Sequence, residues 1–327
     1  MRLASLNEGG RDGRLAVVSR DLERVLRVPG IAPTLQAALD EWDRVQPMLR
    51  SIARLLDAGS PEGTTRFDPA ACLAPLPRAY QWADGSAYVA HIELMRRGHG
   101  LHEMPGWLTT EPLIYQGGSD TLLGPRQPIP LANPDWGLDY EAEIAVITTD
   151  VPMGVTAARA RQCIALVLLA NDVSLRNLMP HELSKGFGFF QSKPPTAFSP
   201  VAASPESLGA AWDGERLTPR LASWVNGDLF GEPWAGKDML FSMPQLIAHA
   251  ARTRPLAAGT IIGSGTVANR DAATGCSCIA ERRVIEAFRD GKPTTPYLRP
   301  GDRVRIQMID ETGTDLFGAI DQEVVKA

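Results

Sequence analysis

A segment rich in proline, alanine and glycine divides the chain of 327 residues into two unequal parts. It covers residues 60–79, and this composition is typical of a linker that runs over a protein surface. A chain of this length can bury an ample core in one large domain or in two unequal ones. We therefore place a domain boundary near residue 75, with a small N-terminal domain at 1–75 and a larger domain at 76–327.

The smaller part predicts a unit with both strands and helix. Apolar segments at 3–6 and 15–18 flank a polar stretch with several glycines, which predicts a β-hairpin. Between residues 35 and 56 the apolar side chains fall close to a 3.6-residue period, which predicts a helix. Pro47 lies inside that helix and is expected to kink it.

The larger part predicts a mainly β domain with a few helices. Along residues 140–146 apolar and polar side chains alternate in part, and the run ends in β-branched residues, which predicts a strand. Residues 156–169 predict a helix with Thr156 as its N-cap. Residues 256–266 predict a strand, a turn and a second strand that ends in a glycine-rich loop.

Local signals near the end of the chain add two elements. Ser242 and Gln245 match a capping box, which predicts the start of a helix. Apolar residues at 304–308, a turn signal at 311–313 and apolar residues at 316–318 predict a terminal hairpin.

Charge and hydropathy narrow the possible partners. The chain has 33 Lys and Arg against 38 Asp and Glu, a net charge of −5, and so lacks the electrostatic signature of nucleic-acid or anionic-membrane binding. No apolar run approaches the ~20 residues that a transmembrane helix needs, and the first residues have no apolar core of signal-peptide length. We therefore expect a cytoplasmic protein without nucleic-acid or membrane partners.

The four cysteines are expected to be small buried side chains. Their spacing suits neither a disulfide framework nor a zinc site. They are Cys72, Cys163, Cys276 and Cys278.

Two glutamates lie two residues apart in the expected strand at 140–146. Residues at this spacing share one face of a strand, so Glu141 and Glu143 would lie side by side. Like charges that close repel unless a cation lies between them, and oxygen ligands suit Mg²⁺, Ca²⁺ or Mn²⁺. The pattern is also compatible with a solvated strand face.

A second polar group follows the expected helix at 156–169. Asp172 could supply a third oxygen ligand, and Arg176 could bind a carboxylate in bidentate fashion. The same residues are compatible with a helix end that carries an exposed ion pair.

Two further candidates remain. His91 stands between apolar neighbours seven residues after Asp84, where it could be either structural or catalytic. The glycine-rich loop at 263–267 lets a ligand approach the backbone closely, and Glu281 follows it. This loop has neither the lysine of a P-loop nor the spacing of a dinucleotide fingerprint.

Taken together, these motifs resemble the fumarylacetoacetate hydrolase family, in particular its hydrolase branch, from about residue 80 to the C-terminus. The segments that carry the resemblance are Asp84-x6-His91, Tyr115–Gly117, Leu138–Glu143, Asn171–Arg176, Ser192–Lys193, Val225–Gly227, Met239–Ser242, Gly263–Thr266 and Glu281. The resemblance implies an α+β, mainly β fold: a mixed β-sheet roll with short helices behind a smaller N-terminal α+β domain. Members of the family are usually homodimers.

The resemblance also implies roles for individual residues. The metal ligands would be Asp84, Glu141, Glu143 and Asp172. The catalytic residues would be His91 as general base, Glu281 as the carboxylate that orients it, and Lys193 and Arg176 as groups that stabilise an oxyanion. The substrate contacts would be Tyr115 and Thr266, with Arg96 or Arg97 in place of a substrate arginine.

The chain departs from the hydrolase branch at three places. Met179 stands where that branch has a glutamine, and residues 194–197 replace a glycine–threonine run. The segment after His91 also differs. These departures bear on the substrate more than on the chemistry.

The sequence therefore predicts a metal-dependent hydrolase that cleaves a C–C bond in a small diketo or oxo acid of the fumarylacetoacetate or acylpyruvate type. A cation, with Mg²⁺ as first choice and Ca²⁺ or Mn²⁺ also compatible, would stabilise the enolate that leaves, while His91 and Glu281 activate water. The alternatives are a hydratase, isomerase or decarboxylase of the same family and a non-catalytic metal-binding dimer.

Overall fold

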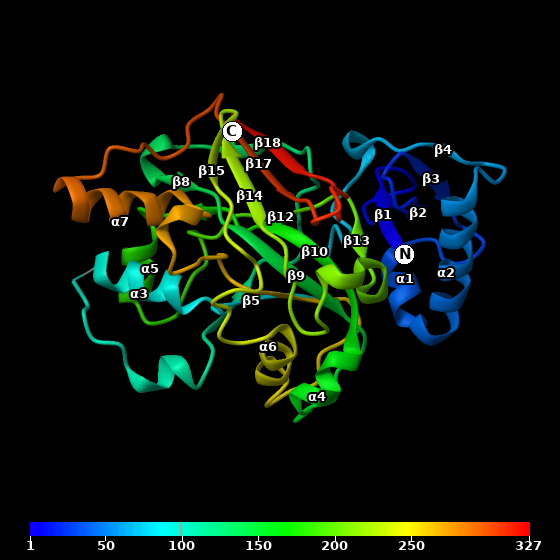
Figure 1. The fold of residues 1–327 in the computed structure, drawn as a ribbon, viewed down its shortest axis with the longest axis horizontal. Coiled ribbons are helices and arrows are strands. Elements are labelled where there is room, and N and C mark those ends of the chain that lie inside the picture. The colour runs from blue at the N-terminus through cyan, green and yellow to red at the C-terminus, as the bar shows by residue number, and fades with distance from the viewer. Residues whose placement is uncertain (99) are drawn as a thin grey trace.

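The computed structural model describes residues 1–98 and 100–327. The largest sheet in this part of the chain has eleven strands and extends across the molecule from the N-terminal hairpin (Figure 1). In spatial order it comprises β4 (Thr65–Arg66), β3 (Arg24–Arg27), β2 (Arg14–Val18), β1 (Arg2–Leu6), β13 (Ala202–Ala203), β10 (Ile164–Asn171), β9 (Ala142–Thr148), β16 (Thr260–Gly263), β5 (Gln81–Gly85) and β6 (Ile114–Gly117), and β12 (Ala197–Phe198) pairs with β10. The pairing of β1 with β13 joins the N-terminal strands to the rest of the sheet.

A second sheet packs on one face of the first. It comprises β15 (Asp228–Gly231), β14 (Leu221–Val225), β17 (Arg303–Met308), β18 (Ile320–Lys326) and β7 (Ile129–Leu131), and β11 (Ser174–Leu175) pairs with β8 (Leu138–Asp139) nearby. Ile144 and Val167 of the large sheet share one hydrophobic core with Val304 and Ile320 of the second.

The opposite face of the large sheet is also buried. Ala145 of β9 and Leu166 of β10 share a second core with Leu39 of α1 (Leu35–Asp40) and Leu49 of α2 (Trp42–Ala58). Because both faces of β9 and β10 are covered, every residue of these two strands is buried.

The remaining helices are short. They are α3 (Val89–Gly98), α4 (Ala157–Ala160), α5 (Met179–Ser184), α6 (Met243–Ala250) and α7 (Ile279–Asp290), with 3-10 turns at Pro69–Ala71, Gly106–Thr109, Pro134–Trp136, Arg161–Cys163, Pro205–Ala211 and Ala272–Thr274. Helices α3, α5 and α7 gather at the side of the molecule away from α1 and α2 (Figure 1). None of the helices in the described ranges is long and apolar enough to cross a membrane.

Several local predictions are confirmed. The N-terminal hairpin forms as β1 and β2, and the strand expected at 140–146 appears as β9, shifted by two residues. Ser242 and Gln245 form the capping box of α6. The expected helix at 35–56 is present, but the chain breaks at Glu41, while Pro47 lies inside α2.

One prediction in the larger part is wrong, and two others hold with different strand bounds. The helix expected at 156–169 ends at Ala160, and residues 164–171 form β10 instead. A strand buried on both faces has a continuous apolar run without alternation, so periodicity alone cannot separate it from a buried helix. Residues 256–266 contain a β-bridge at Leu256, a turn and the single strand β16. The terminal hairpin forms as β17 and β18, although β18 begins at residue 320 rather than in 316–318.

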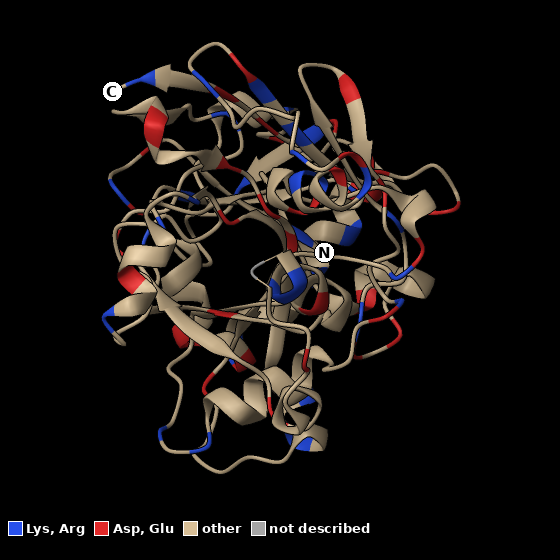
Figure 2. Cartoon of the chain, turned by 90° about the vertical axis from the view of Figure 1, so that its left-hand side faces the viewer, with Lys and Arg blue, Asp and Glu red and all other residues tan. Residues whose placement is uncertain are grey.

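Most of the cysteines are buried, and charged side chains of both signs are mixed along the chain. Cys72, Cys276 and Cys278 are buried and all four thiols are free, whereas Cys163 is only partly buried. In the view of Figure 2, Lys and Arg are interspersed with Asp and Glu along the chain. The division near residue 75 stays a prediction.

The aromatic pair of Trp82 and Phe198 provides a test of the core. Their ring centroids lie 5.5 Å apart in an edge-to-face arrangement, and Phe198 is 1% exposed. Phe198→Ala should lower the free energy of unfolding by about 3–5 kcal/mol, the range for a phenylalanine cavity. Urea unfolding at neutral pH measures this loss. Phe288→Ala, at a position 53% exposed, is the control and should change stability by about 0.5 kcal/mol or less.

Candidate metal and catalytic site

Three carboxylates meet where neighbouring strands of the large sheet end. Asp84 on β5 pairs with Gly263 of β16, while Glu143 on β9 pairs with Ala170 of β10. Asp172 follows β10 directly. The directions of these strands bring the ends of β5 and β10 beside the start of β9. As a result, carboxylate oxygens of Asp84, Glu143 and Asp172 lie within 4.8 Å of one another, and all three residues are buried.

This acidic triad has an unbalanced charge. Neither carboxylate oxygen of Glu143 has a hydrogen-bond partner among the described residues. Burial, together with Asp84 and Asp172, raises the pKa of Glu143 well above its usual value. Burial and Asp172 do the same to the pKa of Asp84. A buried carboxylate without partners is costly, so these oxygen donors fit a hard divalent cation such as Mg²⁺, Mn²⁺ or Ca²⁺.

Glu141 lies beside the triad rather than within it. Glu141 directly precedes β9, which begins at Ala142, and its carboxylate is not in the group of three clustered ligand atoms. Instead, Glu141 accepts hydrogen bonds from Arg176 Nη2 at 2.7 Å and Lys193 Nζ at 2.5 Å. Although burial opposes it, these two cations hold the pKa of Glu141 well below its usual value. Its assignment as a further metal ligand stays a prediction.

Lys193 connects Glu141 to the triad. Its Nζ lies 2.5 Å from Asp172 Oδ2 and 2.9 Å from Ser174 Oγ. Burial opposes the charged form, but Asp172 and Glu141 raise the pKa of Lys193, so the amine is an ammonium. The hydroxyl of Tyr115 donates to both oxygens of Asp172 at 2.7 and 2.8 Å, which places this predicted substrate contact against a candidate ligand.

His91 and Glu281 form a buried pair between two helices. His91 on α3 places Nδ1 at 2.8 Å from Oε1 of Glu281 on α7. The other oxygen of Glu281 accepts a hydrogen bond from Ser277 N–H at 3.3 Å. The imidazole is 17% exposed, whereas the carboxylate of Glu281 is 4% exposed. The geometry brings together the two residues that the sequence predicts as base and orienting carboxylate.

The thiol of Cys278 lies close to this pair. Ligand atoms of His91, Cys278 and Glu281 are within 4.8 Å of one another. Burial, followed by the charge of Glu281, raises the pKa of the thiol well above its usual range. A protonated thiol is a poor metal ligand, so we interpret these residues as a base and its surroundings rather than as a second metal centre.

Asp139 is a site residue that sequence reasoning missed. It accepts hydrogen bonds from Arg176 Nε at 2.8 Å and from the N–H groups of Ile279 and Ala280, at the start of α7, at 2.7 and 2.9 Å. This buried carboxylate therefore ties Arg176 to the helix that carries Glu281. No sequence signal could reveal the contact, because the partners are 37 to 141 residues away.

Ser174 and Thr196 were also missed. Thr196 Oγ1 donates to Asp172 Oδ1 at 2.8 Å, and Ser174 Oγ donates to Glu141 Oε2 at 3.2 Å. Ser174 belongs to the motif at residues 171–176, whereas Thr196 lies in the segment 194–197, which differs from the hydrolase branch. Both hydroxyls help to fix the carboxylates around Lys193.

The remaining predicted substrate contacts, Thr266, Arg96 and Arg97, have different surroundings. Thr266 is buried in the loop after β16, next to Gly265, whose N–H donates to Asp84 Oδ1 at 2.9 Å. Arg96 is half-buried and donates to the carbonyl of Glu103 at 2.9 Å. Arg97 is exposed and lines a pocket.

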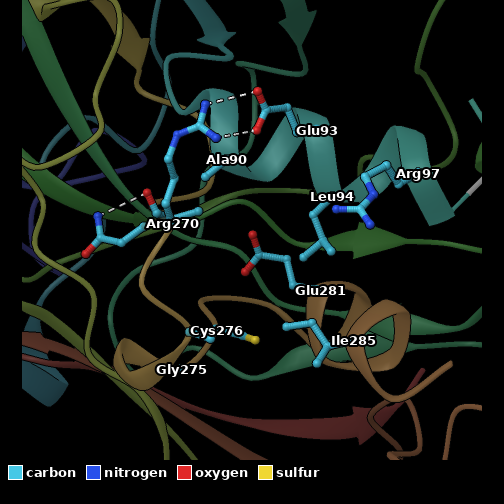
Figure 3. A pocket seen from close by; sticks show the side chains of 12 residues that line it. Ala90, Glu93, Leu94, Arg97, Arg270, Gly275, Cys276, Glu281 and Ile285 are labelled. Atoms are coloured by element: carbon cyan, nitrogen blue, oxygen red, sulfur yellow. Dashed lines mark hydrogen bonds and ion pairs between the residues drawn. The ribbon is translucent and has the colours of Figure 1, made fainter. Parts of the chain in front are cut away.

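That pocket lies between α3, α7 and residues 268–276 and has a volume of about 270 Å³. Figure 3 shows the carboxylate of Glu281 directed into the pocket, below Leu94, and the bidentate pair of Arg270 and Glu93 at its border. The guanidinium of Arg97 lies 5.4 Å from the centre of the Phe288 ring. The pocket therefore combines an apolar wall with a cation beside the His91–Glu281 pair.

Two family models match almost the whole chain. The model described as fumarylacetoacetate (FAA) hydrolase C-terminal matches residues 81–325, and the model described as fumarylacetoacetase N-terminal domain 2 matches residues 1–78.

The individual relatives named below share between 18% and 28% sequence identity with this chain. An uncharacterized protein of Pyrococcus horikoshii is 28% identical over 159 residues, which are 48% of this chain and 66% of that protein. The oxaloacetate tautomerase YisK of Bacillus subtilis is 26% identical over 245 residues, which are 74% of this chain and 70% of that protein. The crystal structure of maleylpyruvate hydrolase from Sphingobium sp. SYK-6, in complex with manganese(II) and pyruvate, matches with a TM-score of 0.67 at 18% identity and covers 100% of both chains. This structural likeness shows the fold.

The unbalanced triad leads to a prediction about stability. Glu143→Gln should raise the melting temperature of the metal-free protein, because glutamine removes one of three crowded negative charges. The pKa of Glu143 is raised in the folded state, so the unfolded chain loses its proton first and stability falls as the pH rises from the usual glutamate pKa toward the raised one. The advantage of glutamine should therefore be absent in acid and grow toward neutral pH.

The same variant should lose its response to metal. Calorimetry with Mg²⁺ or Mn²⁺ should show binding to the wild type and at least about tenfold weaker binding to Glu143→Gln. Glu93→Gln, which changes an acidic residue paired with Arg270, is the control and should bind as the wild type does. Equal affinity in all three proteins would place the metal elsewhere.

Proposed function

Because the chain belongs to the fumarylacetoacetate hydrolase family, we propose that it is a metal-dependent hydrolase that cleaves a C–C bond in a small diketo or oxo acid. The fumarylacetoacetate and acylpyruvate types are the candidate substrates. One observation carries the proposal: an acidic triad in which Glu143 has no hydrogen-bond partner among the described residues, a buried lysine and a His–Glu pair are built into one region of the fold. The proposed assembly is a homodimer that has a small oxo acid as its substrate.

The proposed cation would be held by Asp84, Glu143 and Asp172, with Glu141 as a further candidate. When bound, the cation supplies positive charge that polarises the oxygens of an oxo acid and favours its enolate form. Mg²⁺ is our first choice, and Ca²⁺ and Mn²⁺ offer the same preference for oxygen. The likeness to a hydrolase solved with manganese(II) supports a divalent ion.

The His91–Glu281 pair would generate the nucleophile. Glu281 accepts from Nδ1 of the imidazole, which leaves Nε2 free to take a proton from water. The carboxylate also stabilises the imidazolium that forms. The water oxygen would attack a carbonyl carbon while its proton moves to Nε2.

Lys193 and Arg176 would stabilise the negative charge that develops on the attacked carbonyl oxygen. Their donors already point at carboxylates in this region, Lys193 at Asp172 and Arg176 at Glu141. Collapse of the tetrahedral species would break the C–C bond, and the electron pair would leave on the enolate carbon. The proton held by His91 would then return to that carbon, so the products are two carboxylic acids.

A tautomerase, hydratase, isomerase or decarboxylase of an oxo acid is the second candidate. It is favoured by the likeness to the oxaloacetate tautomerase of Bacillus subtilis over 74% of this chain. Met179 adds support: its sulfur lies 3.8 Å from Arg176 Nη1, where the hydrolase branch has an amide. A metal-binding protein without activity is disfavoured, since it would have no use for the His91–Glu281 pair.

The role of His91 can be tested directly. His91→Ala should bind Mg²⁺ as the wild type does but lose hydrolysis by about 10²-fold or more, the usual effect of a positioned proton-transfer group. The assay is a panel of acylpyruvates, diketo acids and oxaloacetate with Mg²⁺, with products identified by mass. His249→Ala on α6 is the control and should retain activity. Full hydrolysis by His91→Ala would make this histidine structural.

Glu281→Gln distinguishes hydrolysis from decarboxylation. It keeps the size of the side chain but removes the charge that supports an imidazolium, so kcat for hydrolysis should fall more than KM changes. Turnover of oxaloacetate by decarboxylation needs no activated water and should change little. Glu286→Gln, farther along α7, is the control.

Wild type in ¹⁸O water gives an independent measurement. Label in the carboxylate formed by C–C cleavage supports attack by water. Release of CO₂ without a labelled cleavage product would favour the second candidate.

A further inference from the structure

One buried carboxylate anchors the loop that ends at Lys193. Glu182 lies on α5 and accepts hydrogen bonds from the consecutive N–H groups of Phe190, Gln191 and Ser192 at 3.1, 2.6 and 3.0 Å. The hydroxyl of Ser192 adds a fourth bond at 2.5 Å. Burial opposes ionisation, but these four bonds lower the pKa of Glu182 to about 2. The carboxylate is therefore fully ionised at neutral pH and serves as an acceptor only.

At its end the loop is also held by the N–H of Leu175, which donates to the carbonyl of Ser192 at 2.8 Å, but its exposed part has few other restraints. Phe187 is 100% exposed and Phe190 is 86% exposed, so neither aromatic ring holds the loop by packing. Gly186 and Gly188 have φ values of +79° and +90°, a region in which glycine is the preferred residue. Phe189 is the one ring of this segment recorded in a stacking contact, with its centroid 5.5 Å from that of Tyr115.

Lys193 needs a fixed position. Its ammonium lies 2.5 Å from carboxylate oxygens of both Glu141 and Asp172, and 5.2 Å from the centre of the Tyr115 ring. Ser192, whose N–H and hydroxyl both bind Glu182, is the residue immediately before it. Consecutive Cα atoms are about 3.8 Å apart, so a shift of Ser192 moves the lysine backbone with it.

We propose that Glu182 is the positioning residue for Lys193: its carboxylate clamps residues 190–192 and so holds the ammonium between Asp172 and Glu141. The inference rests on the proposed function for the statement that Lys193 meets the substrate. Its geometric part, the dependence of the lysine on Glu182, stands without it. A side chain that does not touch the reacting atoms would then set the rate through another residue.

The test is Glu182→Gln with Glu286→Gln as a matched control. Glu286 clamps a different loop in the same way, accepting from Thr294 N–H, Thr295 N–H and Thr295 Oγ1 at 2.6, 2.8 and 2.5 Å. Glutamine offers one acceptor oxygen and turns an NH₂ group toward N–H donors, so it cannot reproduce either clamp. Both variants should lose stability, but only Glu182→Gln should disturb Lys193.

The first readout does not depend on activity. Each protein is treated with an N-hydroxysuccinimide ester of acetate, and acylation of Lys193 is followed by mass spectrometry. The amine is shielded in the wild type, with its side chain only 7% exposed. We expect acylation at Lys193 to be about fivefold faster or more in Glu182→Gln and unchanged in Glu286→Gln. Equal rates in all three proteins would overturn the proposal, even if no substrate has been found.

The second readout is kinetic, on any oxo acid that the wild type turns over. In Glu182→Gln, kcat should fall by about tenfold to 10²-fold, the scale of a catalytic group misplaced by ~1 Å, while KM and the Kd for Mg²⁺ stay within about twofold. A purely structural role predicts that both glutamine variants change kcat alike. That outcome would also contradict the proposal.

Ser192→Ala covers the case in which Glu182→Gln does not fold. It removes only the hydroxyl donor and keeps the three N–H bonds to Glu182. It should change acylation of Lys193 and kcat in the same direction as Glu182→Gln, by about two- to fivefold. Wild-type behaviour of a folded Ser192→Ala, together with an unfolded Glu182→Gln, would reduce Glu182 to a residue of the fold and overturn the proposal.

Discussion

Repulsion among Asp84, Glu143 and Asp172 is the constraint around which the site is organised. Three carboxylates from three segments are buried within 4.8 Å of one another, so the fold must balance their charge or lose stability. Hydrogen bonds from Tyr115, Thr196 and Lys193 satisfy Asp172. Glu143 has no such partner among the described residues, so the imbalance is concentrated at one position. Unpaired charge at this depth is what a cation site needs and what a structural core avoids.

The two cations of the site are held by three carboxylates, of which only Asp172 belongs to the triad. Arg176 lies between Asp139 and Glu141, and Lys193 lies between Glu141 and Asp172. Asp139 additionally binds the first N–H groups of α7, where a negative charge is favoured by the helix dipole. The position of Glu281 and the position of Arg176 are therefore linked through one buried side chain, although the two residues are 105 apart in sequence.

The sequence predicted which residues lie together better than the elements that carry them. Glu143 lies with Asp172 and His91 lies beside Glu281, as the motifs and the family resemblance implied, while their roles stay predictions. The strand β10, which delivers Asp172, was predicted as a helix, since a run buried on both faces shows no alternation. Glu141 directly precedes β9 and binds Arg176 and Lys193, contacts that no local pattern reveals. Asp139 and Glu182 act through contacts that only the fold creates.

Burial explains why the site combines rigid and adjustable parts. The triad stands on central strands whose residues are buried on both faces, so its geometry is fixed by the core. Lys193 instead follows a surface loop with exposed aromatic rings. An ammonium on a flexible stem can be placed accurately only if its backbone is held, and packing cannot do this at the surface. A buried anion that binds three consecutive N–H groups can, because its bonds are short, directional and shielded from water. The loop is thus ordered by electrostatics where the hydrophobic core does not reach.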